Sequence, residues 1–365
     1  MLHTIEEAIV DIKQGKLIIV VDNEDRENEG DFICAAEAAS PELINFMATQ
    51  GRGLICAPIE ENRAEELQLP LMVRTNTSLH ETAFTVSVDL IGHGCSTGIS
   101  TYDRARTIQA LADEGFKSSD FAKPGHIFPL RAMKGGVLVR TGHTEATIDL
   151  ARLAGCKPAG ALVEILNDDG TMARLPHLLQ KSKDWNLKVI SISDLVKYRL
   201  QRERLVNLNK SFEKMTPFGA FQVHIYSQSN SNAIHVAFVK GDISPKTSTL
   251  VRVQYCDPYA ELMDIIIHGD NSIIHKSLQS ISQSTQSILL LISSTERPLN
   301  PLFRISEGLI TDESSRHDQD QREIGIGSQI LRELGVNKMV LLSNHPKKNI
   351  ALQGYDLEIE RYQTF

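Results

Sequence analysis

Six carboxylates and one arginine are concentrated in ten residues, from Asp22 to Asp31. Closely spaced negative charges repel one another, and the cost of each charge rises as water is removed. A fold keeps such a cluster at a strand end when a divalent cation or a cationic partner neutralises it. A solvated acidic loop is the alternative, but Gly30 and the apolar residues 32–36 favour a tight, ordered turn. The segment therefore predicts a metal or acid–base site.

A second segment, 140–145, carries groups that could work with this cluster. It follows a predicted turn and strand at 135–140 and precedes a helix predicted from Ala146 to Ala154. Arg140 offers a fork of donors for phosphate or carboxylate, and His143 can ligate a metal. Reactive side chains are thus expected at the end of a second strand, as in the acidic cluster.

Two further ionisable residues stand in mostly apolar surroundings. His126 lies in a proline-framed segment, 124–131, which we predict to be a rigid loop; the histidine is either structural or directed into a cleft. Glu164 interrupts an apolar strand predicted at 161–166. It therefore lies either on a solvated face or in the interior, where it would suit proton transfer.

Small and hydroxyl-bearing residues at 93–101 precede a helix predicted from Tyr102 to Asp113. Their backbone N–H groups could bind a phosphate at the positive end of the helix dipole. Ordinary N-capping is an equally good interpretation of this segment alone. The segment 343–348 likewise predicts either a phosphate-contacting loop or a solvated turn.

The elements that must position these groups follow from apolar patterning. Residues 17–21 read as a buried strand that leads directly into the acidic cluster. Thr4, with Glu7 three residues later, predicts a capped helix over 4–15, and Ser40 caps a helix at 41–48. Further strands are expected at 54–57, 82–89, 188–192, 218–226, 235–239, 250–255, 288–292 and 339–342, with helices at 175–185, 194–199 and 329–334 and a mobile loop at 302–321.

The composition bounds the class of protein. A chain of 365 residues accommodates two domains, and 41% hydrophobic with 23% charged residues is typical of a globular protein. The net charge of −8 argues against a nucleic-acid binder. No apolar run approaches the roughly 20 residues that span a bilayer, and no signal peptide is expected. Five cysteines without a C-x-x-C pair indicate reduced thiols in the cytoplasm.

Five segments resemble, in order, motifs of the 3,4-dihydroxy-2-butanone 4-phosphate synthases of riboflavin biosynthesis. They are DRENEGD at 25–31, STGIS at 96–100, PGHIFPLRA at 124–132, RTGHTEATIDLARLAG at 140–155 and NDDGTMARLP at 167–176. The resemblance covers about residues 1–200. It implies conversion of D-ribulose 5-phosphate to 3,4-dihydroxy-2-butanone 4-phosphate and formate, with two Mg²⁺ or Mn²⁺ ions and a homodimeric enzyme.

Carried over residue by residue, the resemblance implies that Glu27 and His143 ligate the metal. His126 and Glu164 match positions that are essential for activity in the family. For the chemistry, we predict that Asp31 and Glu29 handle the first proton transfer, and that His126 and Glu164 handle the later ones. The implied substrate contacts are Arg26, Glu27, Asp31, Arg140, Thr141, Gly142, His143, Thr144 and Glu164.

The second half resembles GTP cyclohydrolase II, through TPFGAFQVHIY at 216–226, GIGSQILRELGV at 325–336 and SNHPKK at 343–348. That family holds zinc with three cysteines. Here only Cys256 remains, residues 265–270 occupy the region of the C-x-C pair, and the family's RQEGRGIGL segment is replaced around 294–299. One thiolate cannot supply three protein ligands, so no zinc and no cyclohydrolase activity are expected. A bifunctional enzyme, or a scaffold or nucleotide-sensing second half, are the alternatives.

The charged, polar segment 197–210 marks the expected domain boundary. We predict a synthase domain over 1–200 and a cyclohydrolase II-like domain over 201–365. The fold class is α/β (α+β), with a mixed sheet in the first domain and an α/β arrangement in the second.

Overall fold

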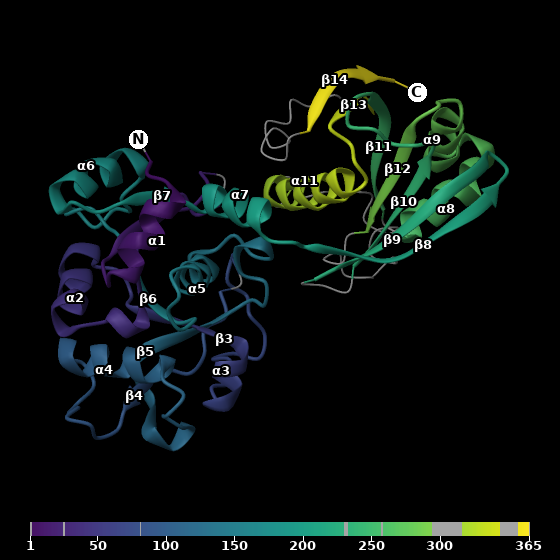
Figure 1. Ribbon diagram of the computed structural model, residues 1–365. Coiled ribbons are helices and arrows are strands. Elements are labelled where there is room, and N and C mark those ends of the chain that lie inside the picture. The colour runs from purple at the N-terminus through teal and green to yellow at the C-terminus, as the bar shows by residue number, and fades with distance from the viewer. Residues whose placement is uncertain are drawn as a thin grey trace. The chain divides into compact units, whose positions relative to one another are not determined.

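The computed structural model describes residues 2–24, 26–80, 82–229, 233–256, 258–293, 316–343 and 357–364, of which 258–260 and 316–324 are described by backbone alone. The chain divides into two compact units, Met1–Tyr198 and Arg199–Phe365 (Figure 1). Each unit is built on a seven-stranded sheet that contains both parallel and antiparallel pairs. The predicted α/β class is confirmed.

The sheet of the first unit has the order β4-β5-β3-β6-β2-β1-β7. The pairs β1–β7 and β3–β5 are parallel, and the other neighbours run antiparallel. The strands are β1 (Ile18–Val21), β2 (Gly30–Ala35), β3 (Cys56–Glu60), β4 (Val88–Leu90), β5 (Phe121–Ala132), β6 (Gly160–Glu164) and β7 (Val189–Ser191).

Helices cover both faces of this sheet. On one face, Phe32 and Val163 share a buried core with residues of α2, α4 and α6. On the other face, α5 contacts β2, β3, β5 and β6, and α1 packs on α5. The helices are α1 (Ile5–Lys13), α2 (Pro41–Phe46), α3 (Glu61–Glu66), α4 (Thr101–Ala112), α5 (His143–Leu153), α6 (Leu175–Trp185) and α7 (Ile192–Arg202), with short turns η1 (Ala36–Ala38), η2 (Met47–Gly51), η3 (Ser118–Asp120) and η4 (Gly136–Leu138).

Local signals predicted several of these elements correctly. The capping box at α1 is present, since Thr4 and Glu7 exchange side-chain and backbone hydrogen bonds. Ser40 caps α2, and β1 is fully buried, as expected of an apolar strand inside a two-faced sheet. The strand expected over 82–89 is much shorter, because its one regular strand is β4, which begins at Val88.

Two predicted elements are wrong. The expected rigid loop at 124–131 lies within β5, which is held between β3 and β4. Gly125 permits this pairing, because a Cβ there would lie 2.0 Å from the Val88 backbone carbon. The expected strand at 135–140 is instead the turn η4, because the buried Asp149 carboxylate accepts a hydrogen bond from the Val137 N–H (2.8 Å).

The sheet of the second unit has the order β14-β13-β11-β12-β10-β9-β8. From β8 to β12 neighbours are antiparallel, and β12, β11, β13 and β14 are parallel. The strands predicted in this half from 218 onward are confirmed, whereas the polar segment 197–210 continues α7 and enters a strand that we did not expect, β8. The strands are β8 (Val206–Thr216), β9 (Gly219–Gln228), β10 (Ile234–Lys240), β11 (Ser248–Cys256), β12 (Ser287–Ser293), β13 (Lys338–Leu342) and β14 (Glu358–Gln363).

Helices lie on opposite faces of this second sheet. Residues of α9 share a small core with Phe221 and Leu289, whereas Gly327 of α11 packs close to Ile292. Because 289 and 292 point to opposite faces of β12, the two helices cover different sides. The helices are α8 (Pro258–His268), the turn η5 (Gly269–Asn271), α9 (Ile273–Ser282) and α11 (Arg316–Glu333). The mobile loop expected at 302–321 lies largely outside the described residues.

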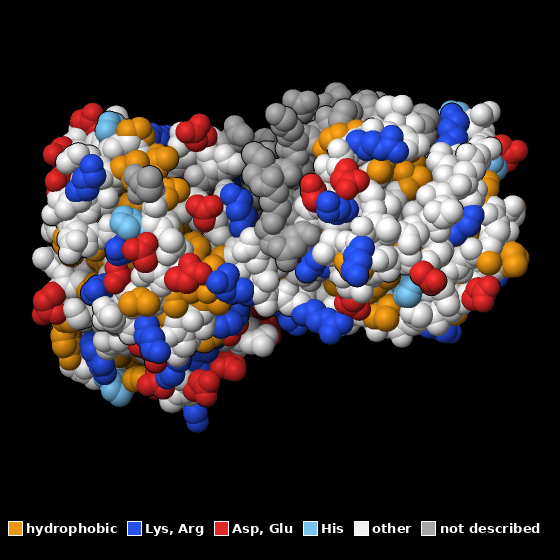
Figure 2. Space-filling view, turned by 45° about the horizontal axis from the view of Figure 1, so that its top comes forward, with side chains coloured by type: hydrophobic (Ala, Val, Ile, Leu, Met, Phe, Trp, Pro, Cys, Tyr) orange, Lys and Arg blue, Asp and Glu red, His pale blue; other side chains and the backbone are white. Residues whose placement is uncertain are grey.

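The surface agrees with the charge balance of the sequence. On the face shown in Figure 2, basic and acidic side chains are interspersed, and no extended basic patch is visible there. Among the described residues, none of the helices combines the length and apolar character needed to cross a bilayer.

Candidate active site

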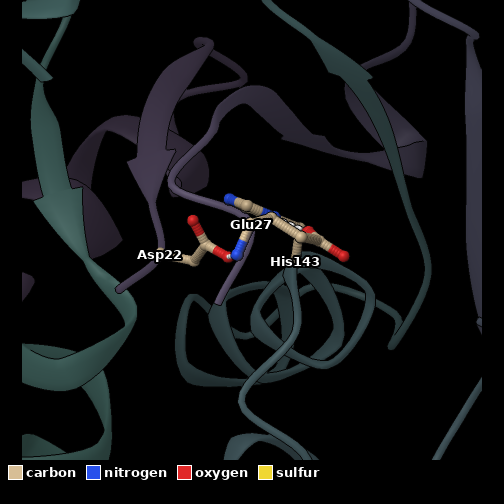
Figure 3. Close-up of side chains that lie close together, drawn as sticks. All are labelled: Asp22, Glu27 and His143. Atoms are coloured by element: carbon tan, nitrogen blue, oxygen red, sulfur yellow. Dashed lines mark hydrogen bonds and ion pairs between the residues drawn. The ribbon is translucent and has the colours of Figure 1, made fainter. Parts of the chain in front are cut away.

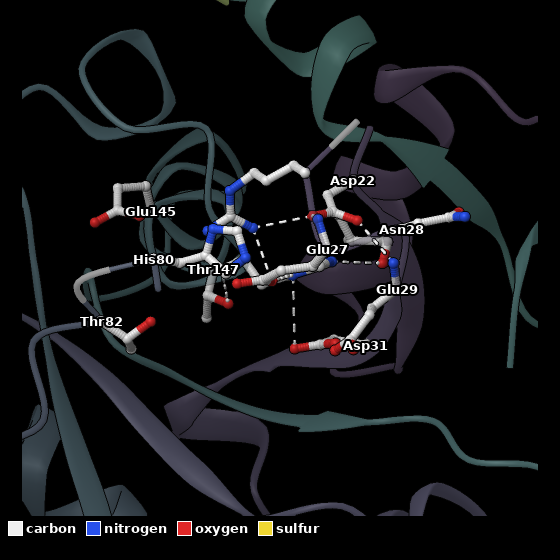
Figure 4. Close-up of polar contacts among 12 residues, drawn as sticks. Asp22, Glu27, Asn28, Glu29, Asp31, His80, Thr82, Glu145 and Thr147 are labelled. Carbon is white, nitrogen blue, oxygen red and sulfur yellow. Dashed lines mark hydrogen bonds and ion pairs between the residues drawn. The ribbon is translucent and has the colours of Figure 1, made fainter. Parts of the chain in front are cut away.

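The turn between β1 and β2 is organised by Asp22, the first residue after β1. Its Oδ2 accepts the N–H of Glu27 (3.0 Å) and its Oδ1 accepts the N–H of Glu29 (2.8 Å) (Figure 4). Arg26 donates to the same carboxylate at 3.0 Å. The Asp22 side chain is only 1% exposed, whereas in a solvated acidic loop it would be accessible to water. The ordered turn predicted from the sequence is therefore confirmed.

Glu27 presents its carboxylate to two cationic groups. Its Oε2 lies 2.7 Å from Arg26 Nη1. The same oxygen lies 3.7 Å from His143 Nδ1, and Figure 3 shows Glu27 beside His143. Burial raises the pKa of Glu27, but His143 and Arg26 outweigh it and lower the pKa to about 2. Glu27 is therefore ionised at ordinary pH, as a ligand for a hard divalent cation must be.

His143 is the first residue of α5 and is buried beside the turn. Its Nε2 lies 3.1 Å from the Val20 carbonyl oxygen, which can only accept, so Nε2 is the donor. Nδ1 consequently faces the carboxylates of Glu27 and Asp31, at 3.7 and 3.9 Å. An imidazole oriented by a backbone carbonyl is the usual arrangement of a metal-ligating histidine.

The donor set around this point fits a divalent cation. Among the described residues, ligand atoms of Asp22, Glu27 and His143 all lie within 4.8 Å of one another. Both Asp22 oxygens already accept backbone hydrogen bonds, whereas Glu27 and Nδ1 of His143 make no comparably short contact with each other. Glu27 and His143 stay the predicted ligands, and Asp22 holds the backbone of the turn.

Asp31 and Glu164 are direct partners across β2 and β6, so both project from the sheet face that α5 covers. Burial, together with the charges of Glu164 and Glu27, raises the pKa of Asp31 to about 8, although His143 opposes this. Burial and the same two carboxylates also raise the pKa of Glu29. Asp31 Oδ1 is buried without a hydrogen-bond partner, an arrangement that a bound ligand would relieve.

Glu164 is neither fully solvated nor fully buried. Its Oε2 accepts the N–H of Leu54 (2.8 Å), and its backbone oxygen accepts the N–H of Gly53 (3.3 Å). A Cβ at Gly53 would lie 2.3 Å from that carboxylate oxygen, so the close approach requires glycine. The loop before β3 thereby fixes the position of Glu164.

Arg140, which we expected to bind phosphate, is held by the protein itself. Its guanidinium pairs with the buried Glu145 carboxylate at 2.7 Å and donates to the His80 carbonyl and the Thr82 hydroxyl. A Cβ at Gly142 would lie 2.3 Å from Arg140 Nη1, so this glycine makes room for the pair. The predicted substrate contacts Thr141, Gly142, His143 and Thr144 thus surround the start of α5, and their binding role stays a prediction.

His126 lies apart from these contacts. Its Nδ1 is 2.7 Å from Asp89 Oδ2, its N–H donates to Asp89 Oδ1 (2.8 Å), and its side chain is 44% exposed. Among the contacts of the described residues, none joins His126 to Glu27, His143 or Glu164. His126 is thus in direct contact with Asp89, and its predicted role beside the other residues stays a prediction.

The segment 93–101 is explained by N-capping. Ser100 caps α4, and the Asp103 carboxylate accepts hydrogen bonds from the Ser96 hydroxyl and the Gly98 N–H, both at 2.9 Å. These contacts confirm the capping interpretation, and a phosphate contact at this place stays a prediction.

Sequence reasoning missed the residues that hold the reactive groups in place. Asp22 directly follows a strand, where aspartate often bonds the backbone of a turn, and this signal could have found it. Glu145, Asp89 and Arg174 left no comparable signal, because each acts on a partner that only the folded chain brings near.

The described part of the second unit shows no comparable cluster. Cys256 ends β11, and its thiol contacts the Gln254 carbonyl oxygen. His268, in the segment 265–270, pairs with Asp264 at 2.8 Å. The replaced segment around 294–299 and most of 343–348 lie outside the described residues.

A carboxylate–imidazole pair that could hold a cation, beside two further carboxylates, is the kind of site that suits proton transfers next to a polarised oxygen. Comparison with known families agrees. Residues 6–198 match the family described as 3,4-dihydroxy-2-butanone 4-phosphate synthase, and residues 208–364 match GTP cyclohydrolase II. The chain belongs to the 3,4-dihydroxy-2-butanone 4-phosphate synthase family, lyases of riboflavin biosynthesis, and carries a cyclohydrolase II domain in its second half.

Two relatives and one solved structure match nearly the whole chain, and a second solved structure matches about half of it. The chain is 47% identical to the riboflavin biosynthesis protein RibBA of Cytophaga hutchinsonii and 45% identical to that of Parabacteroides distasonis, in each case over 98% of this chain and 91% of the relative. A crystal structure of RibBX from A. baumannii, described as a two-domain synthase, matches 99% of both chains with a TM-score of 0.81 and 37% identity. A synthase in complex with two magnesium ions matches 55% of this chain and 98% of its own, with a TM-score of 0.54 and 40% identity.

Proposed function

We propose that the first unit converts D-ribulose 5-phosphate to 3,4-dihydroxy-2-butanone 4-phosphate and formate. The observation that carries this proposal is the convergence of Glu27, Asp31, His143 and Glu164 from β2, β6, α5 and one turn. Glu27 and His143 would hold the cation, with two Mg²⁺ or Mn²⁺ ions per site; a solved synthase described as a complex with two magnesium ions supports a divalent ion. A bound divalent cation supplies positive charge beside the oxygens of an enediolate.

The protein groups supply the proton transfers. Removal of a proton next to a ketone, loss of a hydroxyl, skeletal migration and release of formate require groups that both accept and donate protons. Asp31, whose pKa is raised to about 8, and Glu29, whose pKa is also raised, can exchange a proton near neutral pH. Glu164, held by the Leu54 N–H, would act in the later steps.

Incubation of the full chain with ribulose 5-phosphate tests this function directly. Formate should appear with magnesium present and should stop when a chelator is added. A second series with manganese compares the two ions. Absence of formate at saturating metal and substrate would refute the proposed reaction.

We also propose that the second unit is catalytically silent. The described residues there include no group of three metal ligands, and the A. baumannii match is described as a two-domain synthase over its full length. The relatives named RibBA favour the alternative, a bifunctional enzyme that also hydrolyses GTP. Zinc analysis and a GTP turnover assay on the full chain separate the two; stoichiometric zinc with turnover would overturn our view. If the unit is silent, a scaffold or nucleotide-sensing role remains, and GTP titration of synthase activity tests the latter.

A homodimer in the cytoplasm completes the proposal. The half-exposed His126 has no described contact with the other predicted catalytic residues, and a second copy could supply it to the site. Mixing His126→Ala with Glu164→Gln chains tests this. Restored formate release in the mixture supports a site shared between copies, and no restoration in a verified mixed dimer refutes it. The five free cysteines are consistent with a reducing compartment, which cell fractionation can check.

A further inference from the structure

Arg174, which immediately precedes α6, reaches back to the acidic turn. Its Nη1 donates to the backbone carbonyl oxygen of Glu27 (2.8 Å) and to that of Asn28. These two residues lie about 147 positions earlier in the sequence. Because both bonds go to backbone oxygens, Arg174 acts on the path of the chain and not on the Glu27 carboxylate.

The turn is thus held from two sides. Asp22 accepts the N–H groups of Glu27 and Glu29, and Arg174 binds the carbonyl oxygens of Glu27 and Asn28. Asn28 has a left-handed backbone with φ of 54°, which is unfavourable for most residues. Asparagine adopts this conformation more readily than most residues, and the bonds from Asp22 and Arg174 hold the turn on either side of it.

The backbone of Arg174 is itself held in place by α6. This residue is the N-cap of α6, and one turn further along Leu178 is fully buried against the turn. A Cβ on Gly30 would lie 2.3 Å from Leu178 Cδ1, which shows how closely α6 packs at the start of β2. The helix therefore fixes the position from which the guanidinium acts.

We infer that Arg174 is a positioning residue for the cation site. By fixing the backbone of Glu27, it keeps that carboxylate 3.7 Å from His143 Nδ1, so that a cation binds with little reorganisation. This inference rests on the proposed metal site. Arg174 is not proposed to contact the substrate. Its contribution is to fix the position of the Glu27 backbone.

Titration of the full-chain protein with Mg²⁺, followed by calorimetry, tests the inference. Arg174→Met should weaken Mg²⁺ binding about tenfold or more, the range expected when a group supporting a metal ligand is lost. Arg174→Lys, which keeps a donor but not the fork, should fall between Arg174→Met and wild type. For both variants, kcat for formate release should recover at saturating Mg²⁺, because the proton-transfer groups are untouched.

Arg63 provides the matched control. It also binds backbone carbonyl oxygens in the first unit, those of Leu111, Asp113 and Phe116, with no described contact to the site. Arg63→Met should lower the melting temperature of the unit yet leave Mg²⁺ affinity unchanged.

Each outcome is decisive. Unchanged Mg²⁺ affinity in Arg174→Met, or an equal loss in Arg63→Met, overturns the positioning role. If Arg174→Met does not fold, the Mg²⁺ affinity of Arg174→Lys decides: wild-type affinity overturns the inference, and a loss absent from Arg63→Met supports it. If wild-type protein binds no Mg²⁺, the proposed metal site fails, and the inference fails with it. That result is distinguishable, because it is seen before any variant is measured.

Discussion

The two units use similar scaffolds but differ in what they assemble at their strand ends. In the first unit, β1, β2 and β6 bring carboxylates together, and α5 adds an imidazole to them. In the second unit, the parallel strands β11 and β12 end at Cys256 and Ser293, among described residues that include no comparable cluster. The ends of parallel strands are favourable places for a site, but a site exists only where several segments supply complementary groups.

The pKa shifts in the two units also have different causes. In the first unit, neighbouring charges move the pKa values of Glu27 and His143 in opposite directions, to about 2 and about 9, against the effect of burial. In the second, burial, helped by Glu261, raises the pKa of Cys256 to about 12, and burial alone lowers that of His235 to about 4. Burial therefore favours the neutral forms of Cys256 and His235, whereas the charged partners in the first unit favour the ionised forms of Glu27 and His143.

The largest expected effect comes from removing one ligand in each unit. Glu27→Gln and His143→Gln should each strongly weaken Mg²⁺ binding and reduce formate release at least about 10³-fold, corresponding to roughly 4 kcal/mol of lost transition-state stabilisation. Cys256→Ser, the matched change in the second unit, should leave formate release within about twofold of wild type. Calorimetry measures Mg²⁺ binding, and a formate assay measures turnover. A comparable loss in Cys256→Ser would contradict the proposal that the first unit alone carries the synthase site.

A smaller loss is expected when a proton-transfer group is changed and the ligands are kept. Glu164→Gln preserves shape and the hydrogen bond from the Leu54 N–H, but it cannot exchange a proton. Formate release should fall about 10²-fold or more, the range of general acid–base catalysis, with Mg²⁺ affinity close to wild type. Near-normal turnover in this variant would exclude a proton-transfer role for Glu164.

Much of this contrast could be read from the sequence. The acidic turn, the capped first helix and the buried strand β1 follow from local patterning, and the structure confirms them. The resemblance supplied Glu27 and His143 as a ligand pair, and their side chains do lie together. The side-by-side placement of Asp31 and Glu164 depends on the pairing of β2 with β6, which no local pattern encodes.

The errors have physical causes. The segment 124–131 suggested a loop because proline breaks regular structure, yet strands on both sides hold it in β5. Apolar residues at 135–140 suggested a strand, but Asp149, more than ten residues later, binds the Val137 N–H and turns the chain. Both errors concern tertiary contacts that override local preference.

An effect of about tenfold per pH unit is expected on Mg²⁺ binding. Burial lowers the pKa of His143, but the charges of Asp31 and Glu27 raise it to about 9 in the metal-free protein. Below this pH a cation must displace the proton from Nδ1, so Mg²⁺ affinity should rise with pH up to about 9 and then level off. Calorimetry in buffers of different ionisation enthalpy would detect the released proton.

The same titration on His143→Gln serves as the control, at metal concentrations high enough to detect residual binding. Glu27 stays ionised over this range, since its pKa is about 2, so the remaining pH dependence should be weaker. An equally steep dependence in this variant would assign the released proton to another group, with Asp31 first to be tested.

The smallest expected effect compares one helix cap in each unit. Thr4 caps α1 by accepting the Glu7 N–H (3.2 Å), and Ser272 caps α9 by accepting the His275 N–H (3.4 Å). Thr4→Ala and Ser272→Ala should each cost about 1 kcal/mol in the free energy of unfolding. Because the two units have separate cores, each variant should shift the unfolding of its own unit, followed by hydrogen exchange in that half, and leave the other unchanged. Destabilisation of both halves by either variant would show that the units unfold together, and the second unit would then support the synthase through stability.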